Sequence, residues 1–317
     1  MSERHQARRL FPKIVNWSPD VARLTGMPVI LAALLLTGQG PTPVADLPFQ
    51  HGRGRIWLAA TLNGQPVSAV LDSGAAGIYA MESVAERARG AKGEPFTLFG
   101  AGETAAQAWH AKGLELGLGA VTLSVPYILA PAFGEPPQRP VEVLLGFDLM
   151  MRYAVEVDYR ASRVRLYPSW TYRPPQGYQS LRASFAGRNA VVDAELELPG
   201  LGRRPVKAML DTGTGFGVEI SRKMALREGL DERFAATPIE KGPGGISGGN
   251  RVRHLGGASF KLAGVESNTP VRVSMTDAGA GGTKSDYDVL IGDDVLKGFD
   301  LVFHYWRGRV YLRSARS

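Results

Sequence analysis

Two aspartates of this chain stand in nearly the same local sequence, and two carboxylates that share one proton can activate water. Asp72-Ser73-Gly74 follows the apolar run 69–71, and Asp211-Thr212-Gly213 follows the apolar run 208–210. A single copy could be an ordinary turn. Two copies suggest that the carboxylates meet on a pseudo-twofold axis.

The similarity extends well beyond the two aspartates. The segment Val143–Gly146 matches Val289–Gly292, and residues 153–167 match residues 299–312. The copies are 139 residues apart at the aspartates and 146 apart at these glycines. Order and spacing are therefore kept over more than a hundred residues, which indicates a duplicated domain rather than an array of short repeats.

Each aspartate is expected in a loop directly after a strand. In the first copy, Ile56–Leu62 and Val67–Leu71 are predicted strands, and Asn63-Gly64 between them is a strong hairpin signal because both residues tolerate positive φ. In the second copy, Ala190–Leu198 and Val206–Leu210 play the same parts. Each aspartate is therefore expected directly after the second strand of a hairpin, at equivalent positions of the two copies.

The segments after each aspartate also correspond. Helices are predicted over Ile78–Ala88 and over Ile220–Gly229, where the last glycine suits a C-cap. Glycine-bearing hairpins are predicted over 97–104 and 242–250. Each copy then closes with two apolar residues and a glycine, one helical turn and two short strands. The remaining predicted strands are 114–118, 121–129, 258–262 and 271–275.

Composition narrows the class of protein. The chain has 317 residues, which is typical of about two domains, and its 39 glycines suit an all-β chain with many turns. The net charge of +7 comes partly from the N-terminal leader and forms no basic stripe, so nucleic-acid binding is not expected. There is no cysteine, and the five histidines lack ligand spacing, so neither a metal nor a cofactor is expected.

The N-terminus resembles a targeting segment. Residues 27–36 are uninterrupted apolar residues preceded by basic ones, too few to span a bilayer comfortably but suitable for the core of a secretory signal. Residues 1–45 are therefore interpreted as a signal peptide or an N-terminal membrane anchor, with a buried core helix as the alternative. The protein is expected to be periplasmic, secreted or membrane-anchored outside the cytoplasm.

Together, the two Asp-Ser/Thr-Gly motifs and the later apolar-apolar-Gly segments resemble the retropepsin-like aspartic proteases. The ending 146–166, with Gly-Phe-Asp-Leu-Met and Arg-Val-Arg-Leu, is similar to the bacterial branch of that family. The resemblance covers residues 53–167 and 185–313. It implies a mainly β fold of two tandem β-barrel lobes packed as a pseudo-dimer with short helices. The implied lobes are 46–167 and 178–317, joined by a linker over 168–177.

The resemblance also implies roles for individual residues. Asp72 and Asp211 would be the catalytic pair of an aspartic endopeptidase, and a single chain would supply both, so a monomer that cleaves peptides would suffice. Leu144-Leu145-Gly146 and Leu290-Ile291-Gly292 would buttress the two loops. Residues implied to support the dyad are Ser73, Gly74, Thr212 and Gly213, and those implied to form substrate flaps are Gly100, Ala101, Gly102, Gly245, Ile246 and Ser247. A non-catalytic peptide-binding module with the same fold is the alternative.

Two further patterns compete with this interpretation. Residues 245–249 formally fit the Gly-x-Ser-x-Gly nucleophile motif, but that motif needs a strand before it and a helix after it. The acidic cluster near Asp293 and Asp294 is better explained by helix capping and solvated loop charges than by metal binding.

Overall fold

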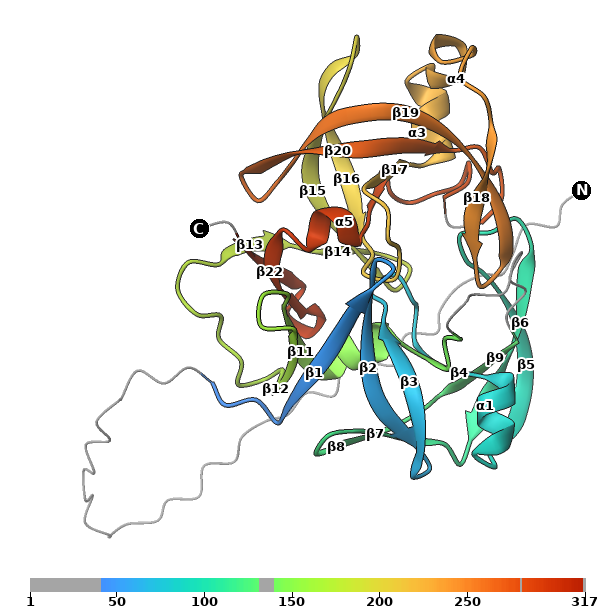
Figure 1. The fold of residues 1–317 in the computed structure, drawn as a ribbon, viewed down its shortest axis with the longest axis vertical. Helices are drawn as coiled ribbons and strands as arrows, with labels where there is room; N and C mark the ends of the chain where they lie inside the picture. The colour runs from blue at the N-terminus through green and yellow to red at the C-terminus, as the bar shows by residue number, and fades with distance from the viewer. Residues whose placement is uncertain (1–40, 131–139, 280, 316–317) are drawn as a thin grey trace, which may run out of the picture. The chain divides into compact units, whose positions relative to one another are not determined.

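The computed structural model describes residues 41–130, 140–279 and 281–315. In these residues the chain is mainly β-structure in two sheets, and its helices are short, which confirms the predicted fold class (Figure 1). The expected targeting segment lies almost entirely outside the described residues. Within the described part of the chain, no helix is both long enough and apolar enough to cross a membrane.

The N-terminal half of the described chain is residues 41–168. Its helices are α1 (Glu82–Arg87) and α2 (Phe147–Arg152). Its strands are β1 (Ala45–Gly52), β2 (Arg55–Leu62), β3 (Gln65–Leu71), β4 (Ile78–Met81), β5 (Ala91–Phe99), β6 (Ala105–Lys112), β7 (Glu115–Leu118), β8 (Val121–Ser124), β9 (Tyr127–Ala130), β10 (Val143–Leu145), β11 (Tyr153–Asp158) and β12 (Arg163–Pro168).

The C-terminal half is residues 178–315. Its helices are α3 (Arg222–Arg227), α4 (Leu230–Arg233), α5 (Asp293–Leu296) and the 3₁₀-helix η1 (Tyr305–Arg307). Its strands are β13 (Gln179–Arg182), β14 (Ser184–Ala186), β15 (Asn189–Leu198), β16 (Gly202–Leu210), β17 (Val218–Ile220), β18 (Glu240–Gly245), β19 (Gly248–Leu262), β20 (Val265–Ser274), β21 (Val289–Ile291), β22 (Phe299–His304) and β23 (Arg309–Ser314).

Strand pairing follows the same pattern in both halves. Hairpin β2–β3 turns at Asn63 and Gly64, both at positive φ as expected. Strand β3 then pairs in parallel with β10, which pairs antiparallel with β4. In the C-terminal half β16 pairs in parallel with β21, which pairs antiparallel with β17. Each aspartate loop therefore follows a strand that pairs with a later strand of the same half.

One sheet joins the two halves. Its order begins β13-β23-β22-β11-β12-β1 and continues through the strands of the N-terminal half (Figure 1). The halves meet in it at the antiparallel pair β11–β22, with Val155 opposite Phe303 and Val157 opposite Leu301. All four of these side chains are fully buried. Burial of such a side chain contributes about 1.5–3 kcal/mol, so this junction holds the halves together firmly. The predicted linker, 168–177, lies between β12 and β13.

Three sequence-based assignments were wrong in detail. Ile78–Met81 is strand β4 rather than the start of a helix, because these four buried residues pair with β10 and β9, and α1 begins only at Glu82. Likewise Val218–Ile220 is strand β17, and α3 follows it with Ser221 as its N-cap. The predicted strand 121–129 is interrupted at Val125-Pro126, since proline cannot donate a ladder hydrogen bond.

Candidate active site

The two motif aspartates lie together in one cavity. The cavity has a volume of about 700 Å³, and both Asp72 and Asp211 line it. Each carboxyl lies against the motif glycine of the other half, and each is close enough to shift the pKa of the other. The backbone N–H of Asp72 donates to the Leu145 carbonyl at 3.0 Å, and that of Asp211 donates to the Ile291 carbonyl at 2.9 Å. The segments expected to buttress the two loops thus hold them directly.

Ser73 and Thr212 bind the two loops to each other. The Ser73 hydroxyl donates to the carbonyl of Leu210, and the Thr212 hydroxyl donates to the carbonyl of Leu71, both at 2.8 Å. The hydroxyls also accept hydrogen bonds from each other's backbone N–H at 3.0 Å. Both residues are fully buried. A buried network in which every member is paired is rigid, so these bonds fix the spacing of the aspartates.

The motif glycines lie against the carboxyl group of the opposite half. A Cβ atom on Gly74 would be 2.6 Å from Asp211 Cγ, and one on Gly213 would be 2.4 Å from Asp72 Cγ. Each glycine N–H also donates to the carboxyl of its own loop, at 3.0 Å for Gly74 and 2.8 Å for Gly213. Any side chain at either position would push the carboxyl groups apart.

Two contacts across the site were missed from the sequence. Arg55 Nε donates to the Gly213 carbonyl at 2.9 Å, and Asn189 Nδ2 donates to the Gly74 carbonyl at 2.7 Å. They stand at equivalent positions, opening β2 and β15. The sequence offers one sign of this role: Arg55 and Asn189 each stand directly before an apolar strand, at matching places in the two copies.

Burial controls the protonation of the pair. Loss of solvent raises the pKa of Asp72 and raises that of Asp211 well above its ordinary value, the latter also because Asp72 carries like charge. The Arg55 guanidinium opposes both shifts and lowers each pKa. Two neighbouring buried carboxyls cannot both ionise cheaply, so the arrangement favours one shared proton.

Both glycine-bearing hairpins expected from the sequence form, and both line the cavity. Strands β5 and β6 make one hairpin, and β18 and β19 make the other. Of the residues implied to form flaps, Gly100, Ala101, Gly245 and Ile246 line the cavity. Ser247 and Gly102 instead take part in the contact between the hairpins.

The two hairpins are joined through Ser247. Its hydroxyl accepts hydrogen bonds from the N–H groups of Gly100 at 2.9 Å and Gly102 at 3.0 Å. Its carbonyl accepts from the Thr104 hydroxyl at 2.7 Å. Arg251 Nε adds an ion pair with Glu103 at 2.8 Å. Ser247 is fully buried in this contact and sits at a hairpin turn, which is not the strand-to-helix turn of a serine nucleophile.

The acidic cluster did not behave as predicted. Helix α5 begins at Asp293, and its N-cap is Gly292, so neither Asp293 nor Asp294 caps it. Asp293 is fully buried, and its carboxyl is bonded to His51 Nε2 at 2.5 Å and to the Tyr159 hydroxyl at 2.7 Å. Asp294 pairs with Lys297 at 2.6 Å on the surface. No group of three potential metal ligands occurs among the described residues.

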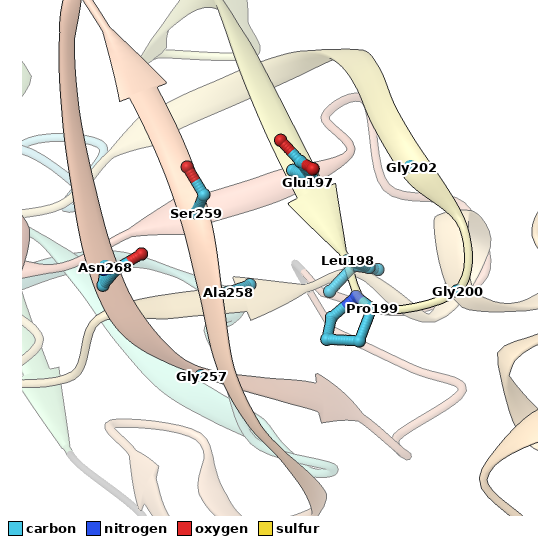
Figure 2. Close-up of a pocket in the computed structure, with 9 residues that line it drawn as sticks. All are labelled: Glu197, Leu198, Pro199, Gly200, Gly202, Gly257, Ala258, Ser259 and Asn268. Atoms are coloured by element: carbon cyan, nitrogen blue, oxygen red, sulfur yellow. The ribbon is translucent and has the colours of Figure 1, made fainter.

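A second hollow, of about 480 Å³, lies on the β15–β16 and β19–β20 hairpins (Figure 2). Three polar residues, Glu197, Ser259 and Asn268, stand in register across β15, β19 and β20. Glu197 is the one ionisable side chain among the described residues that line it, and it pairs with Arg203 at 3.0 Å. This hollow lacks the paired carboxyls of the larger cavity.

Comparison with known proteins agrees with the first of the two motifs. Residues 58–149, which include Asp72 and the β10 segment, match a family model described as aspartyl protease. None of the curated proteins compared matches the chain in sequence. The match supports membership of the aspartyl protease family in its coarse sense, and protease-type chemistry with it.

Proposed function

We propose that the protein is an aspartic endopeptidase that uses Asp72 and Asp211 as its catalytic dyad. The observation that carries this proposal is the reciprocal bonding of Ser73 and Thr212 beneath two carboxyls that each lie against the motif glycine of the other half. A pair of turns that merely capped strands would not need a buried, symmetric connection. The match of residues 58–149 to the aspartyl protease model supports the same chemistry independently.

The proposed reaction needs one proton on the dyad. The ionised carboxyl takes a proton from a water held between the aspartates, and the water oxygen attacks the peptide carbonyl carbon. The protonated carboxyl donates its proton to the carbonyl oxygen as negative charge develops there. The carboxyl that took the water proton then passes a proton to the peptide nitrogen. A hydroxyl of the tetrahedral intermediate gives its proton to the dyad as the carbonyl re-forms and the C–N bond breaks. The dyad must keep this one proton, so activity is expected to favour acidic pH.

An extended peptide is the substrate that suits the cavity. Gly100, Ala101, Gly245 and Ile246 of the two hairpins line it. Hairpin backbone can pair with an extended chain by strand addition, and closure over the peptide excludes water. The hairpins are proposed to act as two flaps.

The proposed architecture is bilobal. Residues 46–167 and 178–317 would be duplicated retropepsin-like lobes joined by the linker 168–177, and each lobe would supply one aspartate. A monomer would therefore be active. Residues 1–45 would be a signal peptide or membrane anchor that places the enzyme in the periplasm, outside the cell or on a membrane facing away from the cytoplasm.

The test is peptide hydrolysis by matched variants. Asp72→Asn and Asp211→Asn should each abolish cleavage of a peptide library between about pH 3 and 8, in protein that elutes as a monomer. Asp193→Asn is the control, since Asp193 is a surface residue that pairs with Lys207 at 2.5 Å. Full activity in Asp211→Asn would overturn the two-lobe dyad. Peptide binding without any cleavage by wild type would instead favour the non-catalytic binding module.

A further inference from the structure

The two sides of the cavity differ at one pair of equivalent positions. In the parallel pair β4–β9, Tyr79 stands opposite Tyr127. In the parallel pair β17–β20, Glu219 stands opposite Arg272. Strands β4 and β17 have the same place in their halves, each antiparallel to the strand that supports the aspartate loop. An aromatic pair in one half thus corresponds to a charged pair in the other.

Around Tyr79 the cavity wall is largely aromatic and aliphatic, and Arg188 donates to the Tyr127 hydroxyl at 3.2 Å. Tyr79 stacks on Tyr127 with ring centroids 5.2 Å apart, and Phe96 packs edge-on against Tyr127 at 5.6 Å. Tyr79 lines the cavity together with Leu98 and Leu144. Surfaces of this kind bind aromatic or aliphatic side chains through burial of apolar area.

The C-terminal side carries a buried ion pair. Arg272 Nε donates to Glu219 Oε2 at 2.6 Å, and the guanidinium lies over the Phe216 ring at 4.2 Å. Glu219 and Arg272 are only 8% and 6% exposed, yet both line the cavity. Removing such a pair from water costs several kcal/mol per ion, and this is recovered only when the remaining polar atoms are also bonded.

That condition is not met by the protein alone. Among the described residues, the Nη groups of Arg272 and Oε1 of Glu219 form no hydrogen bond. Neither the Arg272 Nη groups nor Glu219 Oε1 is fully enclosed by the protein, so they are open to a bound molecule. The pair therefore offers the cavity N–H donors beside a carboxylate acceptor.

We infer that this pair selects a carboxamide side chain, glutamine or asparagine, in a peptide whose aromatic or aliphatic side chain packs on the Tyr79 side. The inference rests on the proposed function and specifies its substrate. The amide oxygen would accept from Arg272 Nη, and the amide N–H would donate to Glu219 Oε1. The ion pair is neutral overall, so a charged side chain would leave one buried charge uncompensated.

The test compares peptides that differ only at the position facing this pair. Wild type should cleave glutamine and asparagine peptides with kcat/KM at least about tenfold above leucine, glutamate or lysine peptides, because a site built for hydrogen bonds rejects analogues that lack them. The double variant Glu219→Leu/Arg272→Met should invert the preference to leucine and keep the aromatic preference on the other side. Such apolar replacement of a buried pair is often neutral for stability.

Two more variants test the role of the Arg272 charge and control for the loss of an ion pair. Glu219→Gln leaves the Arg272 charge unpaired, so selection should move from glutamine to glutamate. Glu195→Leu/Lys261→Met removes a surface pair 3.7 Å apart and should leave selection unchanged. A double variant at Glu219 and Arg272 that keeps the wild-type preference overturns the inference, as does a wild type that selects a charged or apolar side chain at this position.

Binding separates this inference from the proposed chemistry. The same peptides with a reduced, uncleavable central bond are titrated into wild type and the Glu219/Arg272 double variant by calorimetry. If wild type cleaves nothing, the protease proposal fails, while the affinity ratio of glutamine to leucine peptides still tests the subsite. A ratio above about ten in wild type, lost in the double variant, supports it, and equal affinities contradict it.

Discussion

Ser73 and Thr212 each donate a backbone N–H to the other's hydroxyl oxygen, at 3.0 Å in both directions. Each hydroxyl then donates to a backbone carbonyl of the opposite half. One side chain in each loop thus satisfies a buried donor and a buried acceptor that belong to the other loop. The position of each aspartate consequently depends on the residue that follows the other aspartate.

Thr212→Val is expected to lower both stability and activity. It leaves the Ser73 N–H and the Leu71 carbonyl buried without this partner, at about 1–3 kcal/mol for each group. Urea unfolding measures the first effect, and kcat on a cleaved peptide measures the second. Thr212→Ser keeps the hydroxyl and should remain close to wild type. Wild-type stability in Thr212→Val would show that the crossed bonds contribute little.

The dyad makes stability depend on pH. Burial raises the pKa of both aspartates in the fold, so the protonated form is favoured there. The resulting stabilisation is fully present below the unfolded pKa of about 4 and is lost as pH rises through the raised folded values. Asp211→Asn removes an ionisable group, so it should be more stable than wild type near pH 7 and show a flatter dependence on pH. Urea midpoints from pH 4 to 8 measure this, and Asp294→Asn on the surface should not reproduce it.

Arg55 is expected to set the upper pH limit of activity. Its guanidinium lowers the pKa of both aspartates, so Arg55→Gln should raise them and move the basic limb of the kcat/KM profile to higher pH. Both Arg55→Gln and Arg55→Lys weaken the bond to the Gly213 carbonyl and should lower kcat. Arg55→Lys keeps the charge, so the basic limb of its kcat/KM profile should stay near that of wild type. Equal limbs in wild type and Arg55→Gln would exclude the electrostatic role.

Local sequence was sufficient to predict the loops that hold Asp72 and Asp211. An apolar run, an Asn-Gly turn and a second apolar run define hairpin β2–β3 without reference to the rest of the chain. Strand β4 was missed because Ile78–Met81 merges with helix-forming residues of α1. Only the pairing of β4 with β10 and β9, both distant in sequence, identifies it as a strand.

Contacts between the halves could not be predicted from local patterns. Arg55 and Asn189 look like ordinary polar residues at the start of a strand, and their bonds to Gly213 and Gly74 depend on how the halves meet. The same holds for Asp293, whose helix-start position indicated a cap. Its partners His51 and Tyr159 come from the other half and bring the side chain into the interior.

Ser247→Ala is expected to loosen the contact between the two hairpins. It removes the oxygen that accepts from the N–H groups of Gly100 and Gly102, while the Ser247 carbonyl keeps its bond to Thr104. Hydrogen exchange at Gly100 and Gly102 should accelerate because these amides lose their protein partner. Ser247→Thr keeps an acceptor oxygen and is the matched control. Unchanged exchange in Ser247→Ala would show that other contacts hold the hairpins.

Tyr159→Phe should destabilise the fold by about 1–3 kcal/mol, because it removes a hydrogen bond to the fully buried carboxyl of Asp293. Burial and the nearby Asp293 raise the pKa of the Tyr159 hydroxyl well above its ordinary value, so it stays protonated and donates. Tyr153→Phe is the control, since the Tyr153 hydroxyl forms no hydrogen bond among the described residues. Urea unfolding compares them. Equal losses in both variants would mean that the bond joining Tyr159 to Asp293 across the halves adds no stability beyond that of an ordinary tyrosine.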